Sequence, residues 1–240
     1  MSKKIKPDID FEKVQAASID MDFEVVNEFE LTPAHKSFTE LLFQRDTNIV
    51  FVDGPAGSAK TYCAAYTGLH MLRARFAEEM VYIRSIIESA SRSMGALPGE
   101  VEDKFHPWII PLKEKLDELL PSGVSSSLFD RGIVKAIPVN YVRGLTFKNS
   151  VVIVDEAQNL TFSELTTILT RFGNNCKMIV VGDTMQSDIN GKSGFKPMFK
   201  LFDDEQAEEN GVYCFKFTEA DIMRSEMLKF IVNRLEQYHD

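Results

Sequence analysis

Apolar residues along the chain gather in short, nearly continuous runs that are separated by polar and glycine-containing stretches. Such runs, rich in valine, isoleucine and phenylalanine, are typical of strands buried on both faces of a parallel sheet. They occupy residues 48–52, 80–83, 133–139, 150–156, 177–181 and 212–217. We therefore expect each of these runs to form a strand.

The segments between the runs carry helix start signals or apolar residues at helical spacing. Thr32 followed by Pro33 predicts a helix start, and Thr161 with Glu164 predicts a capping box. We expect helices over about 33–45, 60–76, 108–120, 161–172, 195–201 and 225–237, a short one through 128–129, and irregular structure over 86–107. The alternation predicts one doubly wound, mostly parallel α/β domain over 31–240, preceded by a tail or edge element at 1–30.

The composition agrees with a single globular domain. The chain has 240 residues, of which 44% are hydrophobic and 26% charged, and these are ordinary values. Three scattered cysteines favour a reducing cytoplasm, and we find neither a signal peptide nor an apolar run of membrane-spanning length. The net charge of −9 means that a nucleic-acid partner would need a local basic patch.

The most informative stretch is NIVFVDGPAGSAKTY at residues 48–62, which predicts a strand, a glycine-bearing loop and a helix. It matches the phosphate-binding loop G-x-x-x-x-G-K-[ST], except that Ala59 stands where the last glycine is usual. Alanine is comfortable at right-handed helical angles, so we expect Ala59 to leave the course of the loop unchanged. The candidate nucleotide-binding residues are Gly54, Pro55, Ala56, Gly57, Ser58, Ala59, Lys60, Thr61 and Tyr62.

Each part of this loop has a chemical role. Gly54 and Gly57 let the backbone curl so that N–H groups point at a phosphate. Lys60 can reach the β- and γ-phosphates, and the Thr61 hydroxyl can ligate Mg²⁺.

The run 150–156, SVVIVDE, ends in Asp155 and Glu156. Ligands of open α/β sheets bind at the carboxyl ends of the strands. Asp155 suits contact with Mg²⁺, and Glu156 suits polarising the water that attacks the γ-phosphate. The alternative is an acidic pair that merely ends a strand at the surface.

Gln186 lies just after the run 177–181 and could sense the γ-phosphate through a hydrogen bond. Phosphoryl transfer also favours a cation on the developing charge, and Arg84, Arg143, Arg171 and Arg224 all lie near the ends of predicted elements. The candidate catalytic residues are Lys60, Asp155, Glu156, Gln186, Arg171 and Arg224, and each arginine has a surface or structural role as its alternative.

Several residues could contact nucleic acid. Arg84, Arg92 and the serine- and glycine-containing stretch 91–100 suit phosphate contacts, although a plain surface loop explains them nearly as well. His106 and Trp108 could stack on a base, with a packed tryptophan as the alternative.

Taken together, these stretches resemble the PhoH-like family of phosphate-starvation-inducible P-loop ATPases, which is related to the ATPase core of superfamily 1 helicases. The resemblance runs from about Leu31 to the C-terminus and rests on GPAGSAKTY, SMGALPGEVEDKFHPWIIPL, IPVNYVRGLTF, VVIVDEAQN, LTRFG and GDTMQSDINGKSGF. It implies a RecA-like P-loop NTPase fold, ATP and Mg²⁺ as ligands, ATP hydrolysis, and association with RNA or single-stranded nucleic acid. Short versions without extra domains resemble those of tailed phages, in which case the cytoplasm would be that of the host.

The resemblance also carries roles to single residues. It assigns phosphate and Mg²⁺ binding to the loop, the acidic motif to Asp155 and Glu156, a helicase-motif glutamine to Gln186, and a γ-phosphate contact to Arg224. His35 stands where related helicases carry an adenine-reading glutamine, so adenine recognition is not implied there. A helicase site is normally completed between two RecA-like domains, and this sequence contains one. We therefore expect a homo-oligomer, such as a hexameric ring, in which neighbouring subunits complete the site.

Three functions stay open at this point. The first is an ATP-driven motor or remodeller that acts on nucleic acid. The second is a P-loop kinase of small molecules, although the stretches DEAQ at 155–158 and GDTMQ at 182–186 favour water as the acceptor. The third is a nucleotide-dependent scaffold without turnover, which the departure at Ala59 keeps open.

Overall fold

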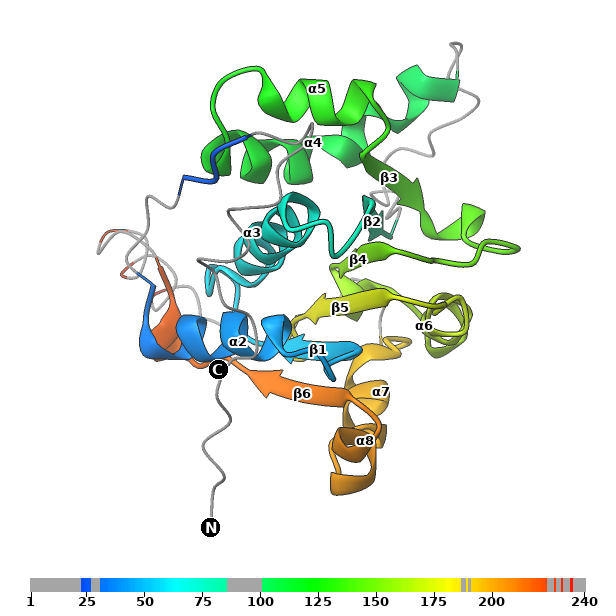
Figure 1. Cartoon of the computed structure of the whole chain (residues 1–240). Helices are drawn as coiled ribbons and strands as arrows, with labels where there is room; N and C mark the ends of the chain where they lie inside the picture. The colour runs from blue at the N-terminus through cyan, green and yellow to red at the C-terminus, as the bar shows by residue number, and fades with distance from the viewer. Residues whose placement is uncertain are drawn as a thin grey trace.

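The computed structural model describes residues 23–26, 31–85, 101–186, 189, 191–223, 227, 230 and 234, and for 101–108 it gives the backbone alone. Within these residues, six parallel strands form one sheet that lies between two layers of helices (Figure 1). The prediction of a doubly wound, mostly parallel α/β fold is therefore confirmed.

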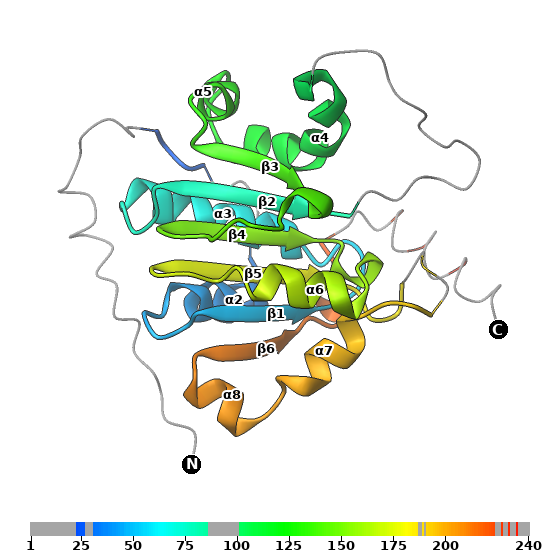
Figure 2. The same ribbon diagram turned by 90° about the vertical axis from the view of Figure 1, so that its right-hand side faces the viewer.

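The strands follow the apolar runs closely. They are β1 (Ile49–Asp53), β2 (Glu79–Arg84), β3 (Val134–Pro138), β4 (Ser150–Asp155), β5 (Cys176–Gly182) and β6 (Val212–Lys216). Their order in the sheet is β3-β2-β4-β5-β1-β6, and every neighbouring pair is parallel. Figure 2 shows the strands in this order with their carboxyl ends on one side, which we call the carboxyl edge.

Helices cover both faces of the sheet. The helices α2 (Pro33–Phe43) and α3 (Lys60–Arg73) lie on one face, and α6 (Phe162–Leu169) and α7 (Phe195–Leu201) lie on the other (Figures 1 and 2). At the two ends of the sheet are α4 (Val101–Leu119) with α5 (Val124–Asp130) beside β3, and α8 (Glu205–Glu209) beside β6.

The apolar core is divided by the sheet into two layers because successive strand side chains point to opposite faces. Val50 and Val52 belong to the layer under α2 and α3, whereas Phe51 between them belongs to the layer under α6 and α7. Every residue of β4 and β5 is buried. These two strands lie in the middle of the sheet, so their ends are held in place on both sides.

Some predicted boundaries were wrong. α4 begins at Val101 rather than at Trp108, so the helix runs through Pro107 and Pro111 and residues 101–107 are not irregular. Proline normally disfavours a helix interior, but Leu112, Leu116 and Leu119 bury the helix against the core, and this packing outweighs the local preference. The acidic run after α7 contains α8, which begins where the Asp204 carboxylate accepts from the Ala207 N–H.

Both ends of the chain lie largely outside the described residues. Of the expected tail 1–30, the structure describes 23–26, where Phe23 is buried and the Val26 N–H donates to the Leu119 carbonyl at 2.8 Å. This piece therefore lies against α4. The expected helix 225–237 falls mostly outside the described residues.

Candidate functional site

The loop after β1 turns sharply at the carboxyl edge and leads into α3. A Cβ added at Gly54 would lie 2.7 Å from the Cβ of Phe217, so only glycine fits beside β6 there. Gly57 has φ 86°, a left-handed conformation that glycine adopts readily. The two glycines are thus required for different reasons, one steric and one conformational.

Ala59 departs from our expectation. It has φ 53° and ψ 22°, which is left-handed rather than right-handed, and it directly precedes α3. The loop enters the helix through this conformation, which glycine adopts readily, and this explains why glycine is usual at this position. An L-residue pays about 1–2 kcal/mol for it, so the alanine keeps the course of the loop at a local conformational cost.

Lys60 folds back on its own loop. Its Nζ donates to the carbonyl of Gly54 at 2.6 Å and to that of Pro55 at 2.8 Å, and it lies 3.4 Å from the Ser58 hydroxyl. Burial lowers the pKa of Lys60, and the carboxylates of Asp183 and Asp155 oppose this shift. The ammonium group is therefore held at the loop, among acids that favour its charged form.

Asp155 at the end of β4 accepts two hydroxyl donors. Thr61 Oγ1 donates to Oδ1 at 2.8 Å, and the phenol of Tyr82 donates to Oδ2 at 2.5 Å. Burial, and then the charge of Asp155, raise the pKa of Tyr82, so the phenol stays protonated and remains a donor. A hydroxyl and a carboxylate oxygen side by side are ligands that Mg²⁺ prefers, so these residues fit that ion.

Glu156 follows in a left-handed conformation with φ 52°. Its Oε2 accepts from Gln158 Nε2 at 2.5 Å, and its Oε1 lies 3.7 Å from the Arg84 guanidinium. The other amide atom of Gln158, Oε1, accepts from the Asp183 N–H at 3.1 Å. The residues after β4 and β5 are thereby joined into one hydrogen-bonded unit.

A cavity of about 320 Å³ opens over this edge. Its lining residues come from the phosphate loop and the start of α3, from α4, from the ends of β4 and β5, and from the segment after η3 (Glu219–Asp221). The predicted site residues that line it are Ala56, Gly57, Ala59, Lys60, Thr61, Tyr62, Asp155, Glu156 and Gln186. The structure thus brings most of the predicted site to one place, while the roles of these residues stay predictions.

Arg171 is not brought to this cavity within the chain. It follows α6, and its carbonyl accepts from the Phe147 N–H at 2.9 Å, in the segments that lead into β4 and β5. It therefore lies at the opposite edge of the sheet, where the strands begin. Arg171 is therefore not among the described residues that line the cavity of its own chain, because α6 returns along the sheet before Arg171 is reached. Its role as a catalytic residue stays a prediction.

Other predicted contacts lie outside the described residues. This holds for Arg224, for Arg92 with the stretch 91–100, and for the side chains of His106 and Trp108. Arg143 is described and is exposed in the segment after β3.

Sequence reasoning missed several residues of the site. Tyr82 was predicted only as part of a buried strand, yet its hydroxyl contacts Asp155. Lys115 and Glu118 were predicted only as part of a helix, yet both line the cavity. A tyrosine within an otherwise aliphatic strand was the one available signal, since a buried phenol needs a partner. Nothing in the spacing indicated that α4 reaches the cavity.

His35 supports the phosphate loop. Its ring is fully buried, lies 4.8 Å from the ring of Phe217, and donates from Nε2 to the Ser58 carbonyl at 3.0 Å. Its Nδ1 accepts from the Thr32 N–H at 3.3 Å, which assigns the proton to Nε2. His35 therefore holds the Ser58 carbonyl of the loop, and in this conformation its ring is not available to bind an adenine base.

Three features define the class of this protein. The sheet is all-parallel, a phosphate loop follows β1, and an acidic pair follows β4, which is separated from β1 by one strand. These are the features of a RecA-like P-loop protein of the nucleotide-binding α/β class. The family model described as PhoH-like protein matches residues 30–236. The chain therefore belongs to the PhoH-like family.

Curated relatives agree with this family. The chain is 33% identical over 195 residues to a PhoH-like protein of Bacillus subtilis, covering 79% of this chain and 59% of that protein. It is 34% identical over 192 residues to a PhoH-like protein of Synechocystis, covering 79% and 57%, and 31% identical over 183 residues to Protein PhoH of Escherichia coli, covering 75% and 50%. The chain thus matches between half and three fifths of the length of these relatives.

Proposed function

We propose that this protein binds ATP with Mg²⁺ and hydrolyses it, and that hydrolysis is coupled to RNA or other single-stranded nucleic acid. The observation that carries the proposal is the convergence of Lys60, the Thr61–Asp155 pair and Glu156 on one cavity at the carboxyl edge. Family membership supports it, since PhoH-like proteins are generally P-loop ATPases.

The residues divide the work as follows. A triphosphate would offer Lys60 an anionic partner in place of the neutral carbonyls of Gly54 and Pro55. Thr61 and Asp155 would hold Mg²⁺, which when bound neutralises charge on the phosphates. The Gly57–Lys60 backbone at the start of α3 contributes N–H donors and the positive end of the helix dipole.

Water is the acceptor that the site favours. Glu156 lines the cavity beside Asp155, and its carboxylate is the group suited to orient water and to take its proton. Gln186 lines the same cavity from the segment after β5. There its side chain would form a hydrogen bond to the γ-phosphate that is lost once hydrolysis has occurred.

Two further parts of the proposal come from the resemblance to superfamily 1 helicases. The first is association with nucleic acid. The second is assembly into a ring, because a helicase site is normally completed between two RecA-like domains, and neighbouring subunits of a ring would bring two such domains together. We also propose a cytoplasmic location, which the three scattered cysteines favour. None of the helices in the described part of the chain has the length and hydrophobicity that crossing a bilayer requires.

Steady-state release of phosphate from ATP tests the enzymatic proposal. We expect Mg²⁺-dependent turnover that single-stranded RNA increases, and a loss of at least about 100-fold in Lys60→Ala and in Glu156→Gln. Lys36→Ala, which removes an exposed lysine on α2, is the matched control and should keep the wild-type rate.

The products separate the three candidate functions. Free phosphate supports hydrolysis, whereas a phosphorylated metabolite in place of free phosphate would establish a kinase. Tight binding of ATP without either product would establish a scaffold that does not turn over.

A further inference from the structure

Arg84, the last residue of β2, contacts Glu156 from outside the nucleotide cavity. The Arg84 guanidinium lies 3.7 Å from Glu156 Oε1, and the two side chains are 29% and 39% exposed. Glu156 is among the residues that line the cavity, and Arg84 is not among the described residues that do so. An anion arriving from solvent can therefore reach Arg84 without entering the cavity.

Both carboxylate oxygens of Glu156 have a protein partner, one through an ion pair and the other through a hydrogen bond. Arg84 lies against Oε1, and Gln158 Nε2 donates to Oε2 at 2.5 Å. Gln158 is itself fixed by the Asp183 N–H, so it has little freedom to release the carboxylate. Arg84 is the partner that can leave, because it is partly exposed and an anion from solvent can replace Glu156 in the ion pair.

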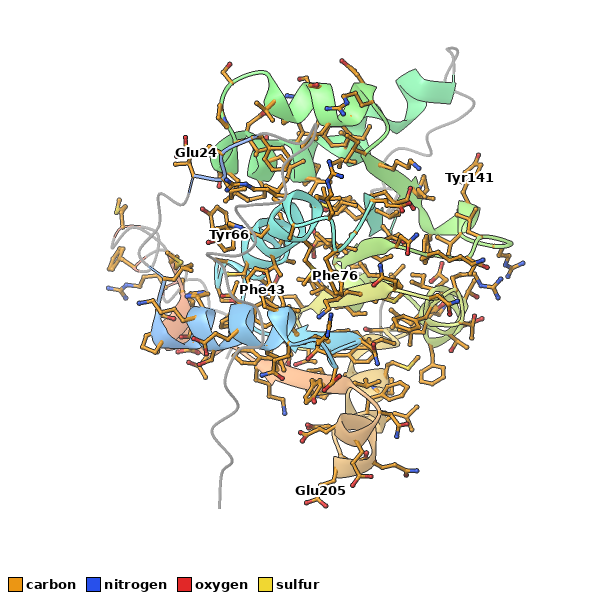
Figure 3. The ribbon with its side chains drawn as sticks, viewed as in Figure 1. Glu24, Phe43, Tyr66, Phe76, Tyr141 and Glu205 are labelled. Atoms are coloured by element: carbon orange, nitrogen blue, oxygen red, sulfur yellow. The ribbon has the colours of Figure 1, made fainter. Side chains whose placement is uncertain are left out.

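The surface beside Arg84 has the side chains that single-stranded nucleic acid requires. β3 is the neighbour of β2 in the sheet, with Pro138 in register with Arg84. Just beyond Pro138, the Tyr141 ring is 62% exposed and Arg143 is exposed. Figure 3 shows Tyr141 projecting away from the body of the molecule. An exposed aromatic ring and an exposed arginine that follow the strand next to Arg84 suit a stacked base and its phosphates.

These observations favour a nucleic-acid phosphate over the γ-phosphate of ATP as the partner of Arg84. The γ-phosphate would lie within the cavity, and Arg84 is not among the described residues that line it. Tyr141 and Arg143 lie on the outer side, after the strand next to β2. The alternative is a plain surface ion pair at a strand end. It predicts that breaking the pair changes neither ATP turnover nor the binding of nucleic acid.

We propose that single-stranded nucleic acid binds over the ends of β2 and β3, and that its phosphate takes Arg84 from Glu156 and so frees Glu156 Oε1 to act on water, while Gln158 keeps its hydrogen bond to Oε2. This inference rests on the proposed ATPase function. An ion pair this exposed biases the held form by about two- to fivefold, which a phosphate contact can overcome. Because linkage is reciprocal, freeing Arg84 from Glu156 must strengthen nucleic-acid binding by the same factor.

The first experiment measures ATP turnover with and without a short oligouridylate. In Arg84→Ala we expect the rate without RNA to rise about two- to fivefold, because Glu156 Oε1 no longer has an ion-pair partner, and stimulation by RNA to disappear. Arg84→Lys should retain part of the stimulation, since it keeps the charge. An unchanged rate without RNA together with full stimulation in Arg84→Ala would overturn the proposal.

The second experiment needs no turnover and measures the Kd of fluorescein-labelled oligouridylate by anisotropy at fixed salt. Glu156→Gln should bind about two- to fivefold more tightly than wild type, because Arg84 is released. Arg84→Ala should bind more weakly, and adding Glu156→Gln to Arg84→Ala should then change nothing. An equal gain from Glu156→Gln in both backgrounds would mean a general charge effect and would reject the link.

Two comparisons complete the test. Tyr141→Ala should weaken RNA binding by about fivefold or more, the size of one lost base stack. Arg75→Ala removes an exposed arginine that follows α3 near the opposite edge, and it should alter neither turnover nor RNA binding.

If wild type binds RNA as predicted but releases no phosphate, the ATPase proposal fails while the Kd cycle still decides the role of Arg84. If wild type binds no RNA, this inference fails and turnover alone judges the ATPase.

Discussion

At the scale of single residues, backbone conformation and buried donors decide how the site is built. Ala59 and Glu156 both adopt left-handed angles, with φ 53° and 52°, one before α3 and the other after β4. Non-glycine residues in such conformations persist only where the surrounding structure holds them. Asp155 is held by Thr61 and Tyr82, so the carboxylate is placed before any nucleotide binds.

Ala59→Gly should increase the stability of the protein. Glycine removes the left-handed penalty, which exceeds its own entropic cost, so we expect the free energy of unfolding to rise by about 0.5–1 kcal/mol. Urea denaturation followed by circular dichroism measures this. Ala56→Gly in the same loop is the control, since Ala56 does not have a positive φ and its replacement should be destabilising. Shifts of the same sign in both variants would contradict the assignment of strain to Ala59.

Tyr82→Phe should destabilise the protein because it leaves Asp155 Oδ2 without its buried donor. Hydrogen bonds to charged groups contribute about 1.5–3 kcal/mol, and we expect a loss of that size in the free energy of unfolding. Tyr213→Phe on β6 is the matched control, for which no partner of the hydroxyl is seen among the described residues, and it should be nearly neutral. Equal effects in the two variants would show that the Tyr82 phenol is not a stabilising donor.

At the scale of elements, a buried lysine ties a helix to the sheet. Lys177 on β5 donates to the carbonyls of Leu42 and Gln44 at 2.6 and 2.8 Å, at the carboxyl end of α2. These carbonyls have no partner within the helix, and the negative end of the helix dipole favours a cation there. α2 also carries His35, which holds the phosphate loop, so Lys177 contributes to the position of the site from the opposite edge.

This lysine predicts how stability depends on pH. Burial lowers the pKa of Lys177 from 10.5 to about 8, with Asp46 opposing the shift. Between these two values the unfolded chain holds a proton that the folded protein has released, so stability rises with pH across this window. Relative to Lys177→Met, wild type should therefore gain up to about 3 kcal/mol between pH 8 and 10.5. Urea titrations of both proteins at a series of pH values measure the difference, and parallel curves would refute it.

At the scale of the whole molecule, the site lies open at one edge of a single α/β core. Among the described residues that line the cavity, the only cationic side chains are Lys60 and Lys115, and Arg84 is not one of the lining residues. Phosphoryl transfer usually gains from a cation on the developing charge. A neighbouring subunit of an oligomer is one source of that cation, and Arg171, at the far edge of the sheet, could act only in this way.

Mixing two inactive variants tests this trans role. If Arg171 acts on the neighbouring subunit, Lys60→Ala and Arg171→Ala are each inactive alone, but in mixed rings some sites pair an intact Lys60 with an intact Arg171. At equal mixing about a quarter of the sites are complete, so about a quarter of the wild-type rate should return. Light scattering in the presence of ATP must first find an oligomer. A monomer in ATP, or no recovery on mixing, would exclude the role.

The fold class and most of the residues that line the cavity could be predicted from the amino-acid sequence. Runs such as 150–156 and 177–181 are apolar throughout because central parallel strands are buried on both faces, so they can be recognised without neighbours. The phosphate loop and the acidic pair were equally readable, because their chemistry requires fixed residue types at fixed local spacing. The capping box of Thr161 and Glu164 was confirmed for the same reason.

Contacts between residues that are far apart in the chain became visible only in the tertiary structure. It placed Tyr82 against Asp155 and Arg84 against Glu156, brought α4 to the cavity, and put Arg171 at the opposite edge. It also extended α4 through two prolines and turned Ala59 left-handed. These features could not be predicted from local sequence preference, because each depends on how strands and helices pack. The order of the strands in the sheet also differs from their order in the sequence.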